Sequence, residues 1–460
     1  MMSTVKFIRT ACLAAAVAVP LQRLQSQPQP QPRDASPDWE KERAFVESNV
    51  EFAVAQTKKM VQAVDADLAG KSYPRTSYKS GALASTNMYD WTSGFFAGNL
   101  WYLYELSRDD LFKAKAEAWT ASLEPLKTYT GTHDLGFMMY CSFGNGYRLA
   151  PDETAAYRDI LLQGAGSLCA RYSEVTRCIQ SWGAGKAWGG EARNFPVIID
   201  NMMNLEMLMW AAKTAGDTAE AKRFEHIAVT HANTTIKNQL RPDYSVYHVV
   251  SYDPQTGEVD NKTTAQGWSD NSTWSRGQAW GIYGFTMMYR ETKDKKYLDV
   301  AQKMADFFLN HPNLPEDKIP YWDFNAQQEG YTPAWPDRTS ALPVPPDELP
   351  IARYRDASAG AIVTSALFEL HRHTGSETYL ALAIAMLHSL ASDKYRANLG
   401  ENANFILKHC VGSIPHGSEI DVPLVYADYY FLEALLRYRN FLSDKNKGTR
   451  EQGNNRTREQ

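Results

Sequence analysis

Apolar residues recur at helical spacing along most of the chain, and this periodicity predicts about twelve helices. Runs in which polar and apolar residues alternate, as in strands, are short, and the clearest is Val246–Tyr252. The pattern therefore predicts an all-α protein. The expected helices cover 39–65, 91–107, 109–127, 135–147, 153–173, 198–214, 217–237, 275–292, 295–311, 356–374, 376–392 and 425–441.

The links between these helices alternate in length. Each even-numbered helix is followed by a short link with Asp or Gly, as at Arg108-Asp109, Lys293-Asp294 and Gly375. Most odd-numbered helices are followed by longer links, up to about 45 residues, and long loops often carry function. Six hairpins with short links at one end and long loops at the other predict a closed double ring of helices, the (α/α)6 barrel.

Small residues are concentrated in the even-numbered helices, for example Gly94, Gly281 and Gly360. Because small side chains allow close packing, we expect these helices to form the inner ring. The barrel is predicted to span 39–444. The charged and polar stretch 445–460 is predicted to be a disordered tail.

The N-terminus resembles a secretory signal. Lys6 and Arg9 form a short positive region, and the apolar run 11–21 is too short to span a bilayer. We predict a signal peptide over 1–27, a flexible leader over 28–38 rich in Gln and Pro, and export to the periplasm or the medium. The cysteines that would remain match no zinc pattern, and whether any of them pair stays open.

Aromatic residues are the most informative part of the composition, with 12 Trp and 25 Tyr. Such rings stack on sugar faces while their polar edges bind hydroxyls, although many also serve as ordinary core residues. The net charge of -5 argues against a nucleic-acid partner. No stretch after the N-terminal run is apolar enough to cross a membrane, and the oligomeric state stays open.

Polar and aromatic clusters fall at the starts of the even-numbered helices. Because inner helices of such a barrel run parallel, all these starts meet at one mouth. Helix N-termini gathered there favour an anionic ligand. The clusters begin at Tyr89, His133, Ile198, Trp274, Arg355 and Tyr426.

Two aspartates in these clusters, Asp134 and Asp200, are candidates for catalysis, with helix N-capping as the alternative for both. Asp200 lies between the apolar runs 196–199 and 202–203. Such a setting raises the pKa of a carboxyl, as a general acid working near neutral pH requires. Paired carboxylates are also the usual groups for glycoside hydrolysis.

Three further polar residues, His248, Gln266 and Arg276, lie in or just after one long loop and are candidates to contact the substrate. A single loop histidine is more often a surface residue. Arg276, on the inner ring, needs an anionic partner, which can be a carboxylate of the protein or of a ligand.

The motifs together resemble the unsaturated glucuronyl hydrolases, glycoside hydrolase family 88, over nearly the whole mature chain and in the same order. The segments that carry the resemblance are 91–96 with 100–102, 133–137 with 144–147, 199–205, 276–280 and 428–435.

The resemblance implies a barrel without metal or organic cofactor that acts on a terminal uronic acid with a C4=C5 double bond. It assigns Asp200 as the general acid/base and Asp134 as a second essential carboxylate. A tryptophan expected between them is Trp182 or Trp188, and Trp188 is taken as the candidate. The matching pocket residues are Trp91, His133, His248, Gln266, Arg276 and Trp280.

The expected reaction begins with protonation of C4 by Asp200. Water, deprotonated by the same carboxylate, then adds at C5, and the hemiketal opens to release the aglycone from C1. Asp134 would bind ring hydroxyls, and Arg276 with Gln266 would help to hold the sugar carboxylate.

The motifs say less about the aglycone sugar, which follows the scissile bond. Lys408, His409, Ser413, His416 and Ser418 could form a sulfate subsite, with a polar surface loop as the alternative. We expect a glycosaminoglycan fragment from chondroitin, hyaluronan or heparin. Other readings are an unsaturated rhamnogalacturonyl hydrolase acting on pectin, a sugar epimerase using His133 and His248, and a glycan-binding protein with a dead site.

Overall fold

The short links between helices share one construction. Arg108 ends α2 (Ser93–Ser107) in the left-handed conformation, with φ 57°. Asp109 then caps α3 (Asp110–Ser122) by accepting a hydrogen bond from the backbone of its first turn. The same pair of steps recurs at Lys293-Asp294. A left-handed residue followed by a cap reverses the chain in two residues, which produces the helical hairpins.

The computed structural model describes residues 38–65, 72–326, 328–332 and 354–458. All the predicted helical segments are present. The helices are α1 (Trp39–Val64), α2, α3, α4 (Leu135–Met139), α5 (Asn145–Leu149), α6 (Thr154–Cys169), α7 (Asn201–Thr214), α8 (Ala219–Asn238), α9 (Ser275–Thr292), α10 (Lys295–Asn310), α11 (Ala357–Thr374), α12 (Glu377–Leu390) and α13 (Val425–Arg458).

The even-numbered helices of the prediction form a closed inner ring, as expected. In order around the ring, α2, α4, α7, α9, α11 and α13 each pack against the next, and α13 returns to α2. Glycines permit this close approach: a Cβ on Gly94 would lie 2.3 Å from the Met138 carbonyl oxygen of α4. The (α/α)6 barrel is confirmed, and the described residues from Glu40 onward form one compact unit.

The helix predicted over 135–147 is interrupted. A π-helical turn, η2 (Tyr140–Gly144), separates α4 from α5. Helical periodicity in the sequence does not distinguish a π turn from an α turn over so few residues. Such turns frequently occur at functional sites.

Short strands fill the long loops, and most of them were not predicted because they are two to six residues long and largely polar. Only β8 coincides with the predicted strand at 246–252. The strands are β1 (Ser72–Ser77), β2 (Leu83–Asn87), β3 (Tyr172–Ser173), β4 (Cys178–Ile179), β5 (Gly185–Lys186), β6 (Ala192–Arg193), β7 (Phe195–Ile198), β8 (Val249–Tyr252), β9 (Val259–Thr263), β10 (Cys410–Ser413) and β11 (Ser418–Val422).

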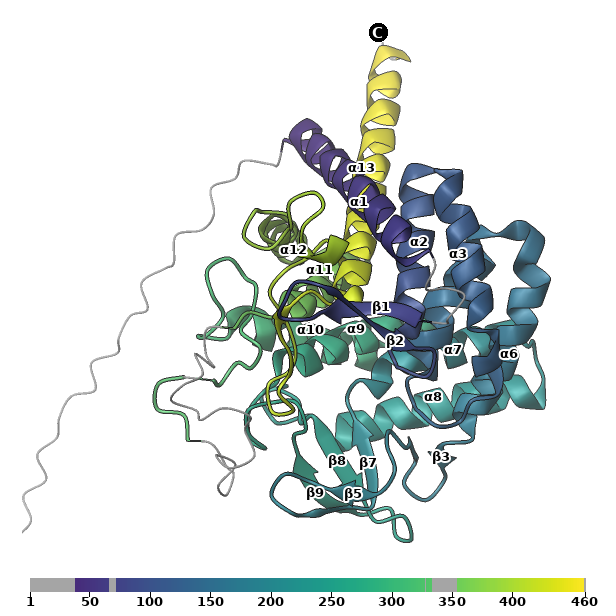
Figure 1. Ribbon diagram of the computed structural model, residues 1–460, viewed down its shortest axis with the longest axis vertical. Coiled ribbons are helices and arrows are strands. Elements are labelled where there is room, and N and C mark those ends of the chain that lie inside the picture. The colour runs from purple at the N-terminus through teal and green to yellow at the C-terminus, as the bar shows by residue number, and fades with distance from the viewer. Residues whose placement is uncertain (1–37, 66–71, 327, 333–353, 459–460) are drawn as a thin grey trace, which may run out of the picture. The chain divides into compact units, whose positions relative to one another are not determined.

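The largest sheet has the order β7-β8-β9 and leads directly into α7 (Figure 1). In the antiparallel register Ile198 lies opposite Val249. The backbone N–H of Ile199 then donates to the His248 carbonyl oxygen at 3.1 Å. This pairing brings Asp200 and His248, which are distant in sequence, close together in space.

The C-terminal prediction and the structure differ. The structure continues α13 to Arg458, where the sequence predicted a disordered tail from 445. Half of the residues in 445–458 are poor helix formers (Asn, Gly and Thr), but extending an existing helix needs no new nucleus. The predicted signal peptide and all but Asp38 of the predicted leader lie outside the described residues.

Four cysteines, Cys141, Cys169, Cys178 and Cys410, are free and buried. Among the described residues, no helix combines the length and apolarity needed to span a bilayer. The same part of the chain contains no group of three or more His, Cys, Asp or Glu residues placed to hold a metal ion.

Candidate active site

Asp200 directly precedes the first turn of α7 and is only 8% exposed. Its side chain does not cap the helix, and its Oδ2 atom has no hydrogen-bond partner among the described residues. The N-capping alternative therefore does not describe Asp200. A buried carboxyl oxygen without a donor is costly for folding, and such groups are characteristic of reactive sites.

The electrostatics of Asp200 follow from this burial. Loss of solvation and the neighbouring charge of Asp134 raise the pKa of Asp200 to about 7. The positive charge of Arg276 and the indole of Trp280 act in the opposite direction. At neutral pH this carboxyl is therefore protonated in part of the molecules and can both give and take a proton.

Asp134 and His133 lie together at the start of α4. His133 is fully buried and donates from Nδ1 to the Ser181 carbonyl oxygen at 3.0 Å, while its Nε2 lies 3.2 Å from Asp134 Oδ1. Burial raises the pKa of Asp134 and lowers that of His133. Asp134 also makes no side-chain cap to α4 and instead accepts a hydrogen bond from Thr132. Its charge acts on Asp200, so the two predicted carboxyls belong to one site.

His248 is buried, with a protonation state fixed by its neighbours. Its Nδ1 accepts hydrogen bonds from the backbone N–H groups of Ala265 at 3.1 Å and Gln266 at 3.2 Å. Burial, with the positive charges of Arg193 and Arg276, holds the pKa of His248 well below 6.5. The ring is therefore neutral and carries its proton on Nε2, which lies 3.9 Å from Asp200 Oδ2.

Arg276 is 1% exposed, and the anionic partner that its burial demands is Asp356, at 2.9 Å from Nη1. Its guanidinium also donates to the carbonyl oxygens of Val411 and Gly412 in β10, and it lies 4.5 Å from the Trp274 ring. The protein therefore supplies the counter-charge of Arg276, and the arginine fixes the strand that carries Ser413.

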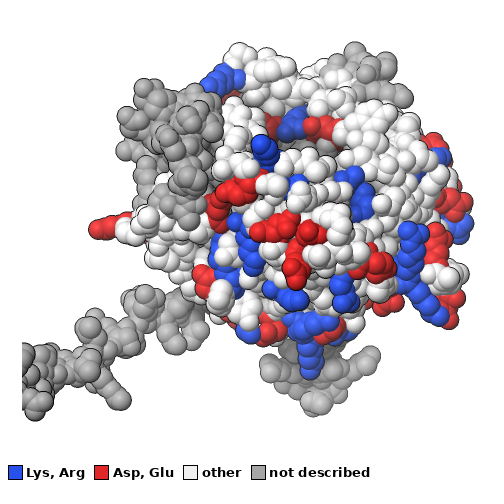
Figure 2. Space-filling view, turned by 90° about the horizontal axis from the view of Figure 1, so that it is seen from below, with Lys and Arg blue, Asp and Glu red and all other residues white. Residues whose placement is uncertain are grey.

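A cavity of about 340 Å³ is lined by Arg276, whereas Asp134, Asp200, His133 and His248 are not among its lining residues. Its wall is formed by the long loops that precede the inner helices, together with the first turns of those helices. The face of the molecule seen from below intermixes acidic and basic side chains (Figure 2). The residues lining the cavity are Arg75, Trp91, Trp182, Arg193, Ala265, Gln266, Arg276, Gly412, Ser413, His416, Ser418, Glu419 and Tyr426.

The predicted aromatic residues lie around this cavity at different depths. Trp91 lines it and packs against Tyr426 at a ring distance of 4.8 Å. Trp280 is completely buried against Asp200. Of the two tryptophans left open by the sequence, Trp182 lines the cavity, whereas Trp188 lies one step outside and packs against His416 at 4.9 Å.

The predicted sulfate cluster divides into two parts. Ser413, His416 and Ser418 line the cavity, and Ser413 Oγ lies 2.6 Å from His416 Nδ1. Lys408 instead donates to the Asp393 carbonyl oxygen, and His409 pairs with Asp421, both away from the cavity. Lys408 and His409 precede β10 and do not line the cavity, whereas Ser413, His416 and Ser418 belong to the β10-β11 hairpin, which forms part of its wall.

Several residues that support the site were not identified from the sequence. Ser181 accepts from His133 through its carbonyl and, through its hydroxyl, from the backbone of Ile198 and the side chain of Asn201. Asn204 binds the backbone N–H of Phe137 at 2.8 Å and so joins α7 to α4. Ser181 carries no sequence signal, whereas Asn204 stands four residues after Asp200, on the same helix face.

A barrel that gathers a buried carboxyl, a second, largely buried one, a neutral histidine and several indoles, with a sugar-sized cavity lined by Trp91 and Trp182, is a carbohydrate-active enzyme of the glycoside hydrolase class. No family model matches the chain. An unsaturated glucuronyl hydrolase of Formosa agariphila is 48% identical over 353 residues, which are 77% of this chain and 81% of the relative. An unsaturated chondroitin disaccharide hydrolase of Streptococcus pyogenes is 32% identical over 81% of this chain and 87% of its own.

The solved structures agree with these relatives. A crystal structure described as an unsaturated glucuronyl hydrolase specific for heparin superposes with a TM-score of 0.75 and 42% identity, covering 86% of this chain and 98% of that one. The chain belongs to the unsaturated glucuronyl hydrolase family. It is a glycoside hydrolase that removes an unsaturated glucuronic acid from the end of an oligosaccharide.

Proposed function

We propose that Asp200 is the general acid/base of this enzyme, that Asp134 binds and stabilises the reacting sugar, and that the aglycone is a glycosaminoglycan sugar. The observation that carries the first assignment is the buried Oδ2 atom of Asp200, which no described group satisfies, on a carboxyl whose pKa is raised to about 7. A general acid is most effective when its pKa lies near the working pH.

The reaction follows from this assignment. Protonated Asp200 gives its proton to C4 of the unsaturated ring, and positive charge develops at C5 and the ring oxygen. The carboxylate then takes a proton from water as the water oxygen bonds to C5. The resulting hemiketal opens, and the C1–O bond to the aglycone breaks. The negative charge of Asp134, on the adjacent inner helix, stabilises the cationic ring.

His248 is proposed to orient the water or a ring hydroxyl. Its Nε2 proton faces Asp200 Oδ2 at 3.9 Å, which is too long for a direct hydrogen bond. An oxygen between them can accept from His248 and donate to Asp200. The two backbone N–H groups that bind Nδ1 keep His248 in the tautomer that this role requires.

The chemistry of the cavity wall supports a sulfated or uronate-containing substrate. Arg193 and His416 lie on the wall with the hydroxyls of Ser413 and Ser418, and these groups supply cationic and neutral donors for anionic oxygens. A relative is called a chondroitin disaccharide hydrolase, and a structural neighbour is described as specific for heparin. We therefore propose lyase-generated disaccharides of chondroitin, hyaluronan or heparin as substrates.

The role proposed for Arg276 changes with the structure. Two of its nitrogens donate to Asp356 and to β10, and Gln266 Nε2 also donates to the Gly412 carbonyl oxygen, at 3.1 Å. We propose that both residues chiefly position β10 and contribute positive potential, while the sugar carboxylate lies nearer to Arg193.

Export is proposed from the N-terminal sequence alone. A short basic region followed by an apolar run of 11 residues, 11–21, is typical of a signal peptide. N-terminal sequencing of the protein from the periplasm or medium of its host should begin close to residue 28. A protein that retains Met1 and stays inside the cell would contradict this proposal.

A panel of unsaturated disaccharides tests the substrate class. Chondroitin, hyaluronan and heparin disaccharides, with and without sulfate, are compared with an unsaturated galacturonyl-rhamnose by following the loss of ultraviolet absorbance of the double bond. We expect turnover of at least one glycosaminoglycan disaccharide and a kcat/KM at least tenfold lower for the pectin fragment. Preferred turnover of the pectin fragment would contradict the proposal.

A further inference from the structure

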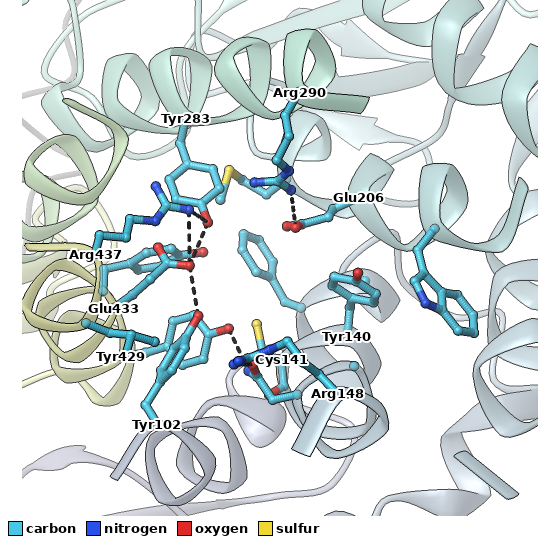
Figure 3. A pocket seen from close by; sticks show the side chains of 18 of the residues that line it. Tyr102, Tyr140, Cys141, Arg148, Glu206, Tyr283, Arg290, Tyr429, Glu433 and Arg437 are labelled. Carbon is cyan, nitrogen blue, oxygen red and sulfur yellow. Dashed lines mark hydrogen bonds and ion pairs between the residues drawn. The ribbon is translucent and has the colours of Figure 1, made fainter. Parts of the chain in front are cut away.

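A second cavity extends from the interior of the barrel, where Gly136, Phe137 and Met203 line it, to the end where α9 and α11 finish. Its volume, about 540 Å³, exceeds the 340 Å³ of the cavity lined by Arg276. Several of its lining residues belong to the last turns of inner helices: Trp210 of α7, Arg290 of α9 and Arg372 of α11. The second cavity thus also reaches the first turns of α4 and α7, to which Gly136, Phe137 and Met203 belong, although it shares no lining residue with the first cavity. Figure 3 shows its charged and aromatic wall.

The π-helical turn η2 forms part of this second wall. Tyr140, Cys141 and Gly144 of the turn line the cavity, as do Asn145 and Arg148 just after it. A π turn is less stable than continuous α-helix and is commonly retained where it places side chains for function. Here it places Tyr140 next to Glu206 at the cavity wall (Figure 3).

The lining has the composition of a sugar site. Tyr140, Tyr147 and Trp210 are only partly buried and pack against one another, with ring distances from Trp210 of 6.2 Å and 5.1 Å. Beside them, Glu206 binds Arg290 and is partly exposed. Aromatic faces next to planar charged groups match the apolar faces and hydroxyl edges of a sugar ring.

The charges at this end favour a neutral ligand. Arg148 pairs with Glu105, Arg290 with Glu206 and Glu369, and Arg437 with Glu369 and Glu433. Among the described arginines of the wall, Arg372 alone is in no ion pair, and it is exposed. The inner helices end here, and their C-termini carry partial negative charge. An anionic sugar is therefore favoured at the catalytic end and disfavoured at this one.

We propose that the cavity lined by Tyr140, Tyr147, Glu206 and Trp210 is a second carbohydrate-binding site, which takes a neutral saccharide. Its ligand stacks on Trp210 and Tyr147 and shares hydroxyl hydrogen bonds with Glu206. Trp210 and Tyr147 line only this cavity, and the two cavities have no lining residue in common.

Ligand-observed NMR with matched variants tests this proposal. N-acetylglucosamine and lactose are the neutral probes, and glucuronic acid is the anionic probe. Full-length wild type should transfer saturation to a neutral probe. Trp210→Ala should weaken its binding about tenfold, as expected for the loss of one aromatic stacking partner. Trp91→Ala, which alters the catalytic cavity, should leave that binding unchanged.

Turnover of the unsaturated disaccharide reports folding of the variants. Trp210→Ala should keep the wild-type kcat/KM. Tyr147→Ala, which also alters the second cavity, replaces it if Trp210→Ala does not fold. Three outcomes would overturn the proposal. Either no neutral probe binds, or binding of the neutral probe survives both Trp210→Ala and Tyr147→Ala, or Trp91→Ala abolishes that binding. Preferential binding of glucuronic acid in the second cavity would also overturn the proposal.

Discussion

Asp200 at one end of the barrel and Glu369 at the other are both buried, but their pKa values shift in opposite directions. At the mouth, Asp200 Oδ2 has no hydrogen-bond partner among the described residues, and burial raises its pKa to about 7. At the far end, Glu369 binds Arg290 with both oxygens and lies 2.8 Å from Arg437, and these charges hold its pKa far below the ordinary value. The same degree of burial thus gives a reactive acid at one end and a structural anion at the other.

Partners, and not burial alone, make this difference. Asp428 is an instructive third case, because burial raises its pKa to about 7 as well. Its two oxygens, however, accept backbone N–H groups of Ile406 and Leu407, each at 2.9 Å. Asp428 therefore serves to tie the 406–407 loop to α13. A raised pKa marks a candidate acid only where the carboxyl also lacks partners.

Asp200→Asn should have the largest effect on activity. The amide keeps the shape of the side chain but cannot protonate C4, so kcat/KM should fall by about 10³-fold, within the usual range for a general acid–base residue. Thermal stability should stay the same or rise, because the substitution removes a buried ionisable group without a partner.

The assay is the loss of ultraviolet absorbance of the unsaturated disaccharide, with Asp428→Asn as the matched control. Asp428→Asn should lose stability, since one acceptor of two backbone hydrogen bonds is removed, yet keep most of its turnover per folded molecule. A fully active Asp200→Asn enzyme would remove the distinction between the two ends.

Glu369→Gln should have the largest effect on stability. The substitution leaves Arg290 and Arg437 with less counter-charge, and breaking buried ion pairs on one side costs roughly 3 kcal/mol of unfolding free energy. Urea denaturation measures this loss, while kcat per folded molecule should not change. Glu124→Gln, in the exposed pair with Lys127, is the control and should cost less than about 1 kcal/mol. Equal losses in both variants would show that the far-end network is not structural.

The pH dependence sharpens the role of Asp200. Since the acid form protonates C4, kcat/KM should fall about tenfold per pH unit above about pH 7. The folded pKa of Asp200 lies above its value in the unfolded chain, 3.8, so its contribution to stability is present below about pH 4 and lost as the pH rises through 7.

Asp200→Asn lacks this titration. Its melting temperature, compared with that of the wild type, should therefore increase between pH 4 and pH 8. Melting curves of both proteins across that range measure the difference. A constant difference would mean that Asp200 does not titrate with a raised pKa in the folded protein.

The barrel was accessible from the sequence because its helices repeat one local rule. Apolar spacing gives each helix, and short links such as Arg108-Asp109 give each hairpin. The two candidate carboxyls were accessible for a similar reason: both stand at helix starts, and the parallel inner ring brings those starts together. Strands such as β10 and β11 were missed because they have only four and five residues, too few for a clear alternating pattern.

Partner choice was the part that local sequence did not determine. Arg276 needed an anion, and only the fold shows that Asp356, 80 residues away, supplies it. The same holds for Ser181, which lies 48 residues from His133 and is fixed by hydrogen bonds to β7. Lys408 and Ser413 illustrate the limit most clearly, since five residues separate them and only Ser413 lines the cavity.

Substitutions of Ser413 and Lys408 give the smallest predicted change, an increase in KM for Ser413→Ala alone, and they test directly whether the cavity binds the substrate. Ser413→Ala removes one hydroxyl beside His416, and a neutral hydrogen bond is worth about 0.5–1.5 kcal/mol. The KM for a sulfated disaccharide should therefore rise about 2- to 10-fold at unchanged kcat. Lys408→Ala, whose ammonium binds the Asp393 carbonyl oxygen, should leave KM unchanged although it removes a full charge. A larger effect from Lys408 would mean that distant charge, and not contact within the cavity, determines how the enzyme binds sulfate.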